Sequence, residues 1–136
     1  MDLVICEIVV ICEIVNDTCR PYIPQVLLHQ FGLRENSGGA GKHRGGEGII
    51  REIEFRRPVT ASILSERRVL APRGMAGGMD GARGENILVR NNGKRVYLGG
   101  KNSVLIAKGD RICIRTPGGG GWGTPVQQEK TSPRCR

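Results

Sequence analysis

NILVRNNGKRVYL occupies residues 86–98 and decides the fold class, because two short runs of strand-forming residues flank a turn signal. The turn is Asn91-Asn92-Gly93, and an Asn-Gly pair between two such runs is typical of a β-hairpin. Further along the chain, residues 103–107 (SVLIA) and 111–115 (RICIR) flank a second turn, Lys108-Gly109-Asp110. We therefore expect four short strands between residues 86 and 115.

The preceding part of the chain shows the same alternation of short strand-like runs and turns. Short β-like runs at residues 26–34, 49–55 and 60–67 alternate with glycine-rich turns, and Pro58 follows the second run. No stretch of ten residues shows the 3.6-residue period of a helix. The sequence predicts a mostly β fold of about seven short antiparallel strands with Gly-rich loops.

Composition bounds the class of protein. The 136 residues suffice for one small domain, and the low aromatic content (4%) leaves few large side chains for a core. The net charge is +8, although residues 1–19 contain four acids and no base. Such a charge suits nucleic acid, an acidic partner or an anionic substrate, but it also fits a solvated basic surface. The bases are scattered along the chain, which favours the solvated surface.

The N-terminal segment, residues 1–19, contains the hexapeptide VICEIV twice, at residues 4–9 and 10–15. Its high β-propensity makes it a pairing or aggregation hazard, and a duplication without function is the simplest explanation. The apolar run is too short for a membrane span, is interrupted by Glu7 and Glu13, and lacks the basic start of a signal peptide. We expect a cytoplasmic protein, with a polar, disordered tail at residues 127–136.

The five cysteines contain no Cys-x-x-Cys pair, so we expect free thiols and no zinc site. His29 and His43 lie in no recognisable nucleophile motif, and the sequence offers no catalytic set and no metal-ligand set. Residues 65–68 (SERR) place a carboxylate beside two guanidinium groups. Either Glu66 orients an arginine for an anion or interface contact, or the group is an ordinary surface ion pair.

Two glycine-rich loops need an explanation. Residues 37–48 (SGGAGKHRGGEG) fail as a P-loop, because Asn36 stands where the first glycine is needed and His43 follows Lys42. One Arg-Gly-Gly triplet is weak evidence for RNA binding. Residues 117–123 (PGGGGWG) match a dinucleotide fingerprint formally, but no helix follows. We expect structural turns that need positive φ or close backbone approach, with Trp122 packed on the body of the domain.

Five motifs taken in order resemble a known family. They are FGLRENSGGAGKHRGGEGIIREIEF (31–55), SILSERR (62–68), PRGMAGGMDGARGENILVR (72–90), LGGK (98–101) and GDRICIRTPGGGGWGTP (109–125). This series resembles the C-terminal end of the hydantoinase B/oxoprolinase family, in the version found in eukaryotic ATP-dependent 5-oxoprolinases. The resemblance implies that residues 20–126 form a partial C-terminal unit of a larger domain, and it leaves residues 1–19 outside the family.

The resemblance also implies a function. Family members of this type hydrolyse 5-oxo-L-proline to L-glutamate in glutathione metabolism, with ATP, Mg²⁺ and K⁺ expected for the complete enzyme and none bound by this chain alone. The expected partners are a hydantoinase A-like ATPase portion and an N-terminal hydantoinase B-like portion, in cis or in trans. We expect a homo-oligomer, no membrane and no specific nucleic acid. The alternatives are a non-catalytic basic docking module and a vestigial fragment.

Within this framework the site candidates are side chains that could meet the substrate, its phosphorylated form or an interface, together with the glycines of the two loops. The side chains are Arg34, Lys42, Arg44, Arg51, Glu66, Arg67 and Lys101. The glycines are Gly38, Gly39, Gly41, Gly45, Gly46, Gly118, Gly119, Gly120 and Gly121. The competing idea is that these glycines let the β unit close and dock on the other portions.

Overall fold

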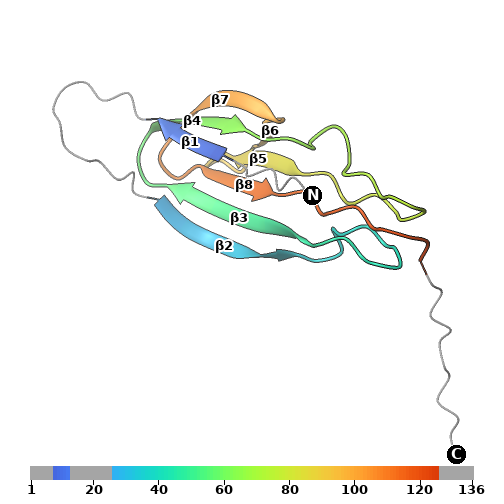
Figure 1. Cartoon of the computed structure of the whole chain (residues 1–136). Coiled ribbons are helices and arrows are strands. Elements are labelled where there is room, and N and C mark those ends of the chain that lie inside the picture. Colours follow the sequence, from blue (N-terminus) through green and yellow to red (C-terminus); the bar gives the residue numbers. More distant parts are fainter. Residues whose placement is uncertain (1–7, 13–25, 126–136) are drawn as a thin grey trace, which may run out of the picture.

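Two antiparallel sheets form the body of the molecule (Figure 1). The computed structural model describes residues 8–12 and 26–125, and in these residues it contains no helix that could span a membrane. The strands are β1 (Ile8–Cys12), β2 (Val26–Arg34), β3 (Gly48–Phe55), β4 (Val59–Leu64), β5 (Glu85–Val89), β6 (Arg95–Tyr97), β7 (Lys101–Ile106) and β8 (Arg111–Arg115). One sheet has the order β1-β4-β7, and the other has the order β2-β3-β8-β5-β6. The mostly β fold is confirmed.

The core lies between these sheets and follows from the alternation of side chains along each strand. In β4, Val59, Ala61 and Ile63 are buried, whereas the residues between them are only half-buried. The other members of the core are Phe55, Leu88, Leu98, Ile106, Ile112 and Ile114. Burial of a valine, leucine, isoleucine or phenylalanine side chain contributes about 1.5–3 kcal/mol relative to an exposed one, so this cluster is a main source of the fold's stability.

The predicted hairpin is confirmed. β5 pairs with β6 in the register Ile87↔Tyr97, and Gly93 has the positive φ of 82° that this turn requires. The second turn exists, but it joins the two sheets instead of closing a hairpin. β7 pairs with β4, whereas β8 pairs with β3 and β5.

The strand expected at residues 60–67 was wrong at its end, because β4 stops at Leu64. The Ser65 amide and hydroxyl both donate to the carbonyl oxygen of Gly100, the residue directly before β7, at 2.7 and 3.1 Å. Arg67 then adopts a positive φ of 59°, which a continuing strand does not allow.

An eighth strand, β1, forms within the duplicated hexapeptide and pairs with β4. The strand pairing expected of that segment is therefore made with another strand of the same chain. The polar tail predicted at residues 127–136 and most of residues 1–19 lie outside the described residues.

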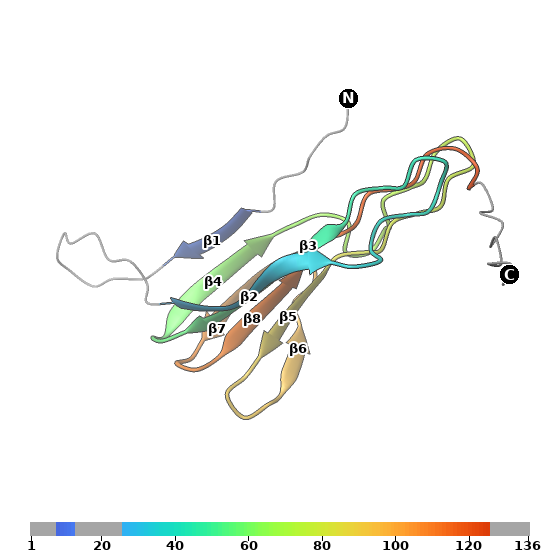
Figure 2. The same ribbon diagram turned by 90° about the horizontal axis from the view of Figure 1, so that it is seen from below.

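Three glycine-rich segments leave one end of the sandwich and run side by side (Figure 2). We call residues 35–47, 65–84 and 116–125 the glycine bundle. Backbone hydrogen bonds hold it together, for example from Gly39 N to Gly119 O at 2.8 Å and from Met79 N to Ala40 O at 2.7 Å. A Cβ atom on Gly118 would lie 1.9 Å from the carbonyl oxygen of Ser37. Close backbone approach, one of the two explanations left open above, accounts for most of these glycines. Gly77 and Gly123 have the positive φ of the other explanation, and a Cβ atom on Gly46 would meet nothing within 4 Å.

Candidate functional site

The predicted cations at the base of the glycine bundle have intramolecular partners. The Arg34 guanidinium donates to the carbonyl oxygens of Arg83 at 2.6 Å and of Thr116 at 3.1 Å, so it joins three segments where they leave the sandwich. Arg44 donates to a carboxylate oxygen of Glu47 at 2.7 Å and to Asn36 Oδ1 at 3.4 Å. Both side chains therefore have a structural role, and their contact with a substrate anion stays a prediction.

Arg51 and Lys42 are exposed. The Arg51 guanidinium lies 5.6 Å from the centre of the Phe31 ring, its neighbour across β2 and β3, in a cation–π contact. The Lys42 side chain crosses Gly123, where an added Cβ would lie 3.0 Å from the lysine Cβ. The Lys42 amide also donates to the carbonyl oxygen of Gly123 at 3.0 Å, so the residue is held by its backbone and by the stem of its side chain.

The cluster at residues 65–68 is divided between surface and interior. The carboxylate of Glu66 pairs with Lys101 at 3.7 Å, and both side chains are well exposed, so this pair contributes under about 1 kcal/mol. Arg67 is exposed, and its carbonyl oxygen accepts from Gly84 N. Arg68 is the buried arginine, which the site prediction missed. It donates to the carbonyl oxygen of Glu66 at 2.7 Å and to Asn86 Oδ1 at 2.9 Å.

Glu47 is a second residue that sequence reasoning missed. One carboxylate oxygen accepts from Ser37 N at 2.6 Å, from Ser37 Oγ at 2.8 Å and from Gly38 N at 3.1 Å. The Ser37 hydroxyl bond is the largest cause that lowers the pKa of Glu47, and the two amides and the Arg44 charge add to it against partial desolvation. The ionised carboxylate closes the loop of residues 37–47 at its base.

Asp110 plays a similar part at the opposite end of the sandwich. It is 1% exposed, and it accepts from Arg90 at 2.7 Å and from the amides of Asn91 and Ala107, each at 2.9 Å. Burial raises the pKa of this carboxyl, but the Ala107 amide, Arg90 and the Asn91 amide together lower it by more, so the net pKa is below the ordinary value. Asp110 therefore anchors the two turns of this end as a carboxylate.

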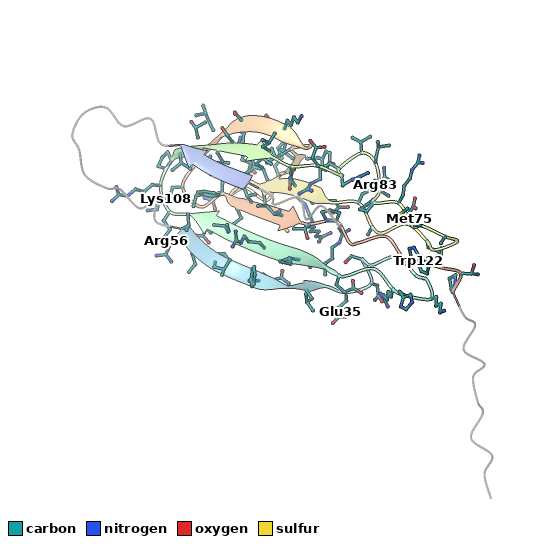
Figure 3. All side chains as sticks on the ribbon, in the orientation of Figure 1. Glu35, Arg56, Met75, Arg83, Lys108 and Trp122 are labelled. Carbon is teal, nitrogen blue, oxygen red and sulfur yellow. The ribbon has the colours of Figure 1, made fainter. Side chains whose placement is uncertain are left out.

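Trp122 was expected on the body of the domain, and that prediction was wrong. Its backbone pairs with His43 in both directions at 2.9 Å, which holds it on the glycine bundle. Its ring lies 6.0 Å from the His43 ring and is 53% exposed. Figure 3 shows Trp122 and Met75 near each other far from the sandwich, whereas Lys108 and Arg56 lie at the other end. Met79 is exposed on the same bundle, so its outer part displays large apolar side chains beside exposed polar ones such as Lys42 and His43.

The described residues offer little for acid–base or metal chemistry. Within residues 8–12 and 26–125, no three His, Cys, Asp or Glu side chains cluster closely enough to hold a metal ion. An open depression of about 500 Å³ is lined by Pro58, Thr60, Leu105 and neighbouring residues, and its one charged side chain, Arg90, is paired with Asp110. His29 donates to or accepts from Glu54 at 2.6 Å on the surface of β2 and β3.

Comparison with known proteins identifies a family and several relatives that this chain resembles. The family described as hydantoinase B/oxoprolinase matches residues 22–125. The chain is 60% identical over 101 residues to 5-oxoprolinase 1 of Arabidopsis thaliana and 56% identical over 99 residues to 5-oxoprolinase of Saccharomyces cerevisiae. These matches cover 74% and 72% of the chain, and the chain spans about 8% of the length of each relative.

A solved structure shares the fold. The ATP-dependent caprolactamase of Pseudomonas jessenii superposes with a TM-score of 0.62 at 24% identity, over 77% of this chain and 19% of that one. The family match covers three quarters of the sequence and includes both glycine-rich loops. The chain therefore belongs to the hydantoinase B/oxoprolinase family.

Proposed function

We propose that residues 20–126 form the C-terminal β unit of a 5-oxoprolinase-type enzyme, which hydrolyses 5-oxo-L-proline to L-glutamate with ATP as the driving reagent. The observation that carries the proposal is the 60% identity over 101 residues to a protein named 5-oxoprolinase. The proposal includes ATP, Mg²⁺ and K⁺ as cofactors of the complete enzyme, a cytoplasmic location and a role in glutathione metabolism. The chain acts with a hydantoinase A-like portion and an N-terminal hydantoinase B-like portion, in cis or in trans.

The unit positions other parts of the enzyme and supplies no catalytic residue of its own. Arg34 and Arg44 are used to hold the glycine bundle together. The exposed cations Lys42, Arg51, Arg67 and Lys101 remain the candidates for an anionic group of the substrate. On β2, Phe31 is 61% exposed and Leu33 is 69% exposed. Contiguous apolar surface of this kind marks an interaction site in soluble proteins. These surfaces support docking against the remaining portions of the enzyme.

The test is a chimera of Arabidopsis thaliana 5-oxoprolinase 1 in which the matching region is replaced by residues 22–125 of this chain. We expect ATP-dependent glutamate release within about tenfold of the natural enzyme, a difference of about 1.4 kcal/mol in transition-state stabilisation. Deletion of the region serves as the control and abolishes the activity. The isolated chain releases no glutamate. A folded chimera of normal mass without activity would refute the proposal.

A further inference from the structure

β1 covers one edge of β4, and it comes from outside the family region. Its five residues pair antiparallel with β4 without interruption, from Ile8↔Leu64 to Cys12↔Thr60. The family match begins at residue 22. Figures 1 and 2 both show β1 beside β4 at the side of β4 away from β7. Within the family region itself, this edge of β4 has no strand partner among the described residues.

β4 has the properties of a strand acceptor. Its inner side chains, Val59, Ala61 and Ile63, are fixed in the core, and its other edge pairs with β7 along its whole length. Its backbone is therefore held extended and presents a row of N–H and C=O groups. Proteins cover such edges, because an open edge pairs with any extended chain and leads to aggregation. Addition of an antiparallel strand is an established mode of peptide recognition.

We propose that this edge of β4 is a strand-acceptor site and that β1 occupies it in place of an extended apolar segment from the rest of a hydantoinase B/oxoprolinase chain. The inference rests on the proposed function. The occupant is defined by β1 itself, IVVIC, which is apolar throughout and spans about 17 Å as a five-residue strand. The chain spans about 8% of its 5-oxoprolinase relatives, so their remaining length is the source of the segment.

A disulfide trap tests the β1–β4 register in the full chain. Thr60→Cys places a thiol opposite Cys12, and directly opposed strand residues lie within the Cα separation that a disulfide accepts. Cys6, Cys19 and Cys135 are changed to Ser, and Ser103→Cys on β7 is the matched control. With oxidised glutathione we expect at least tenfold more intramolecular disulfide for Thr60→Cys than for the control. Equal trapping, or trapping only between two copies, overturns the proposal.

Amide hydrogen exchange tests whether another segment replaces β1. In the full chain, Val10→Pro removes an amide in the middle of β1. The Ser65 amide donates toward β7, at Gly100, so the alternate amides of Thr60, Ser62 and Leu64 point toward β1. We expect exchange of these three amides to become at least tenfold faster, with residues 111–115 unchanged because β8 pairs with β3 and β5. The chimera described above contains no β1, yet we expect the same three amides to exchange as slowly as in the unmodified chain.

The outcomes separate the two proposals. An active chimera whose β4 amides exchange as fast as in the Val10→Pro chain shows that no segment occupies the edge, which overturns the strand-acceptor site and leaves the proposed function standing. An inactive, folded chimera refutes the proposed function and the strand-acceptor site with it. No change of exchange on Val10→Pro also overturns the site, because β1 then does not cover this edge.

Discussion

Neighbouring glycines of the same loop are predicted to respond in opposite ways to alanine. A Cβ atom on Gly45 would lie 2.1 Å from the carbonyl oxygen of Gly119, whereas a Cβ atom on Gly46 would meet nothing within 4 Å. Neither glycine has a φ in the left-handed region. Gly45→Ala and Gly46→Ala therefore differ in close approach alone, which makes each the control of the other.

The magnitude follows from the hydrogen bonds that the two segments share. To reach even 3.0 Å from the new Cβ, the backbone at Gly119 must move away by about 1 Å, and small-to-large changes in tight sites cost about 1–3 kcal/mol. The bonds from Gly39 N to Gly119 O and from Gly119 N to Gly46 O, both 2.8 Å, then lengthen out of range. Each contributes about 1 kcal/mol, so the loss of both accounts for about 2 kcal/mol of that cost.

We expect Gly45→Ala to lower the free energy of unfolding by about 2–3 kcal/mol, which in a domain of about 100 residues lowers Tm by about 10–20 °C. Gly46→Ala is expected to be neutral or to raise stability by up to about 1 kcal/mol, because alanine restricts the unfolded chain. Thermal denaturation followed by circular dichroism measures both. Equal Tm values for the two variants would show that the bundle does not need this close approach.

Three further predictions use other parts of the chain. The pKa of Glu47 is lowered on folding, so the ionised carboxylate stabilises the folded chain above its ordinary pKa of 4.5, and this stabilisation is lost as the pH falls through the folded-state pKa. Glu47→Gln should therefore lower Tm at pH 7. The difference in Tm from the unmodified chain should vanish in acid. Asp110→Ala should cost about 3 kcal/mol by chemical denaturation, since it leaves Arg90 without its buried partner. Lys108→Ala, at an exposed position of the same turn, should change stability by less than about 0.5 kcal/mol. Trp122 is the only tryptophan, so its emission should be red-shifted in the isolated chain and should shift to shorter wavelength when the 5-oxoprolinase portion lacking this region is added; an unchanged emission on binding would place the docking surface elsewhere.

The sequence predicted those parts of the fold that depend on neighbours along the chain. The Asn92-Gly93 turn requires positive φ and joins strands that pair with each other, so its local signal was sufficient. The turn at Gly109 has the same local signal, a glycine with φ of 85°, yet it crosses between the sheets. What separates the two turns is the partner of β7, namely β4, which lies 37 or more residues earlier in the chain. Periodicity and turn propensity carry no information about such distant pairing.

The site was predicted less well for a related reason. Side-chain type indicated that Arg34 and Arg44 could bind an anion, but their partners are carbonyl oxygens and a carboxylate that come close only after folding. Glu47 and Asp110 carried no signal of their own, because an acid among glycines or in a turn is ordinary in sequence. Their lowered pKa values arise from amides and arginines that the fold collects around them.

The glycine bundle explains why a segment so rich in glycine can still be specific. In residues 35–47 and 116–125 the buried residues are glycines and Ser37. Backbones that touch directly leave little room between them for side chains, so the residues of these two segments other than glycine and Ser37 are exposed or half-buried. Lys42 and Trp122 are exposed for this reason. The bundle therefore holds its shape through backbone hydrogen bonds and displays its side chains to a partner. Loss of a glycine should weaken docking through shape, and loss of Trp122 should weaken it through contact.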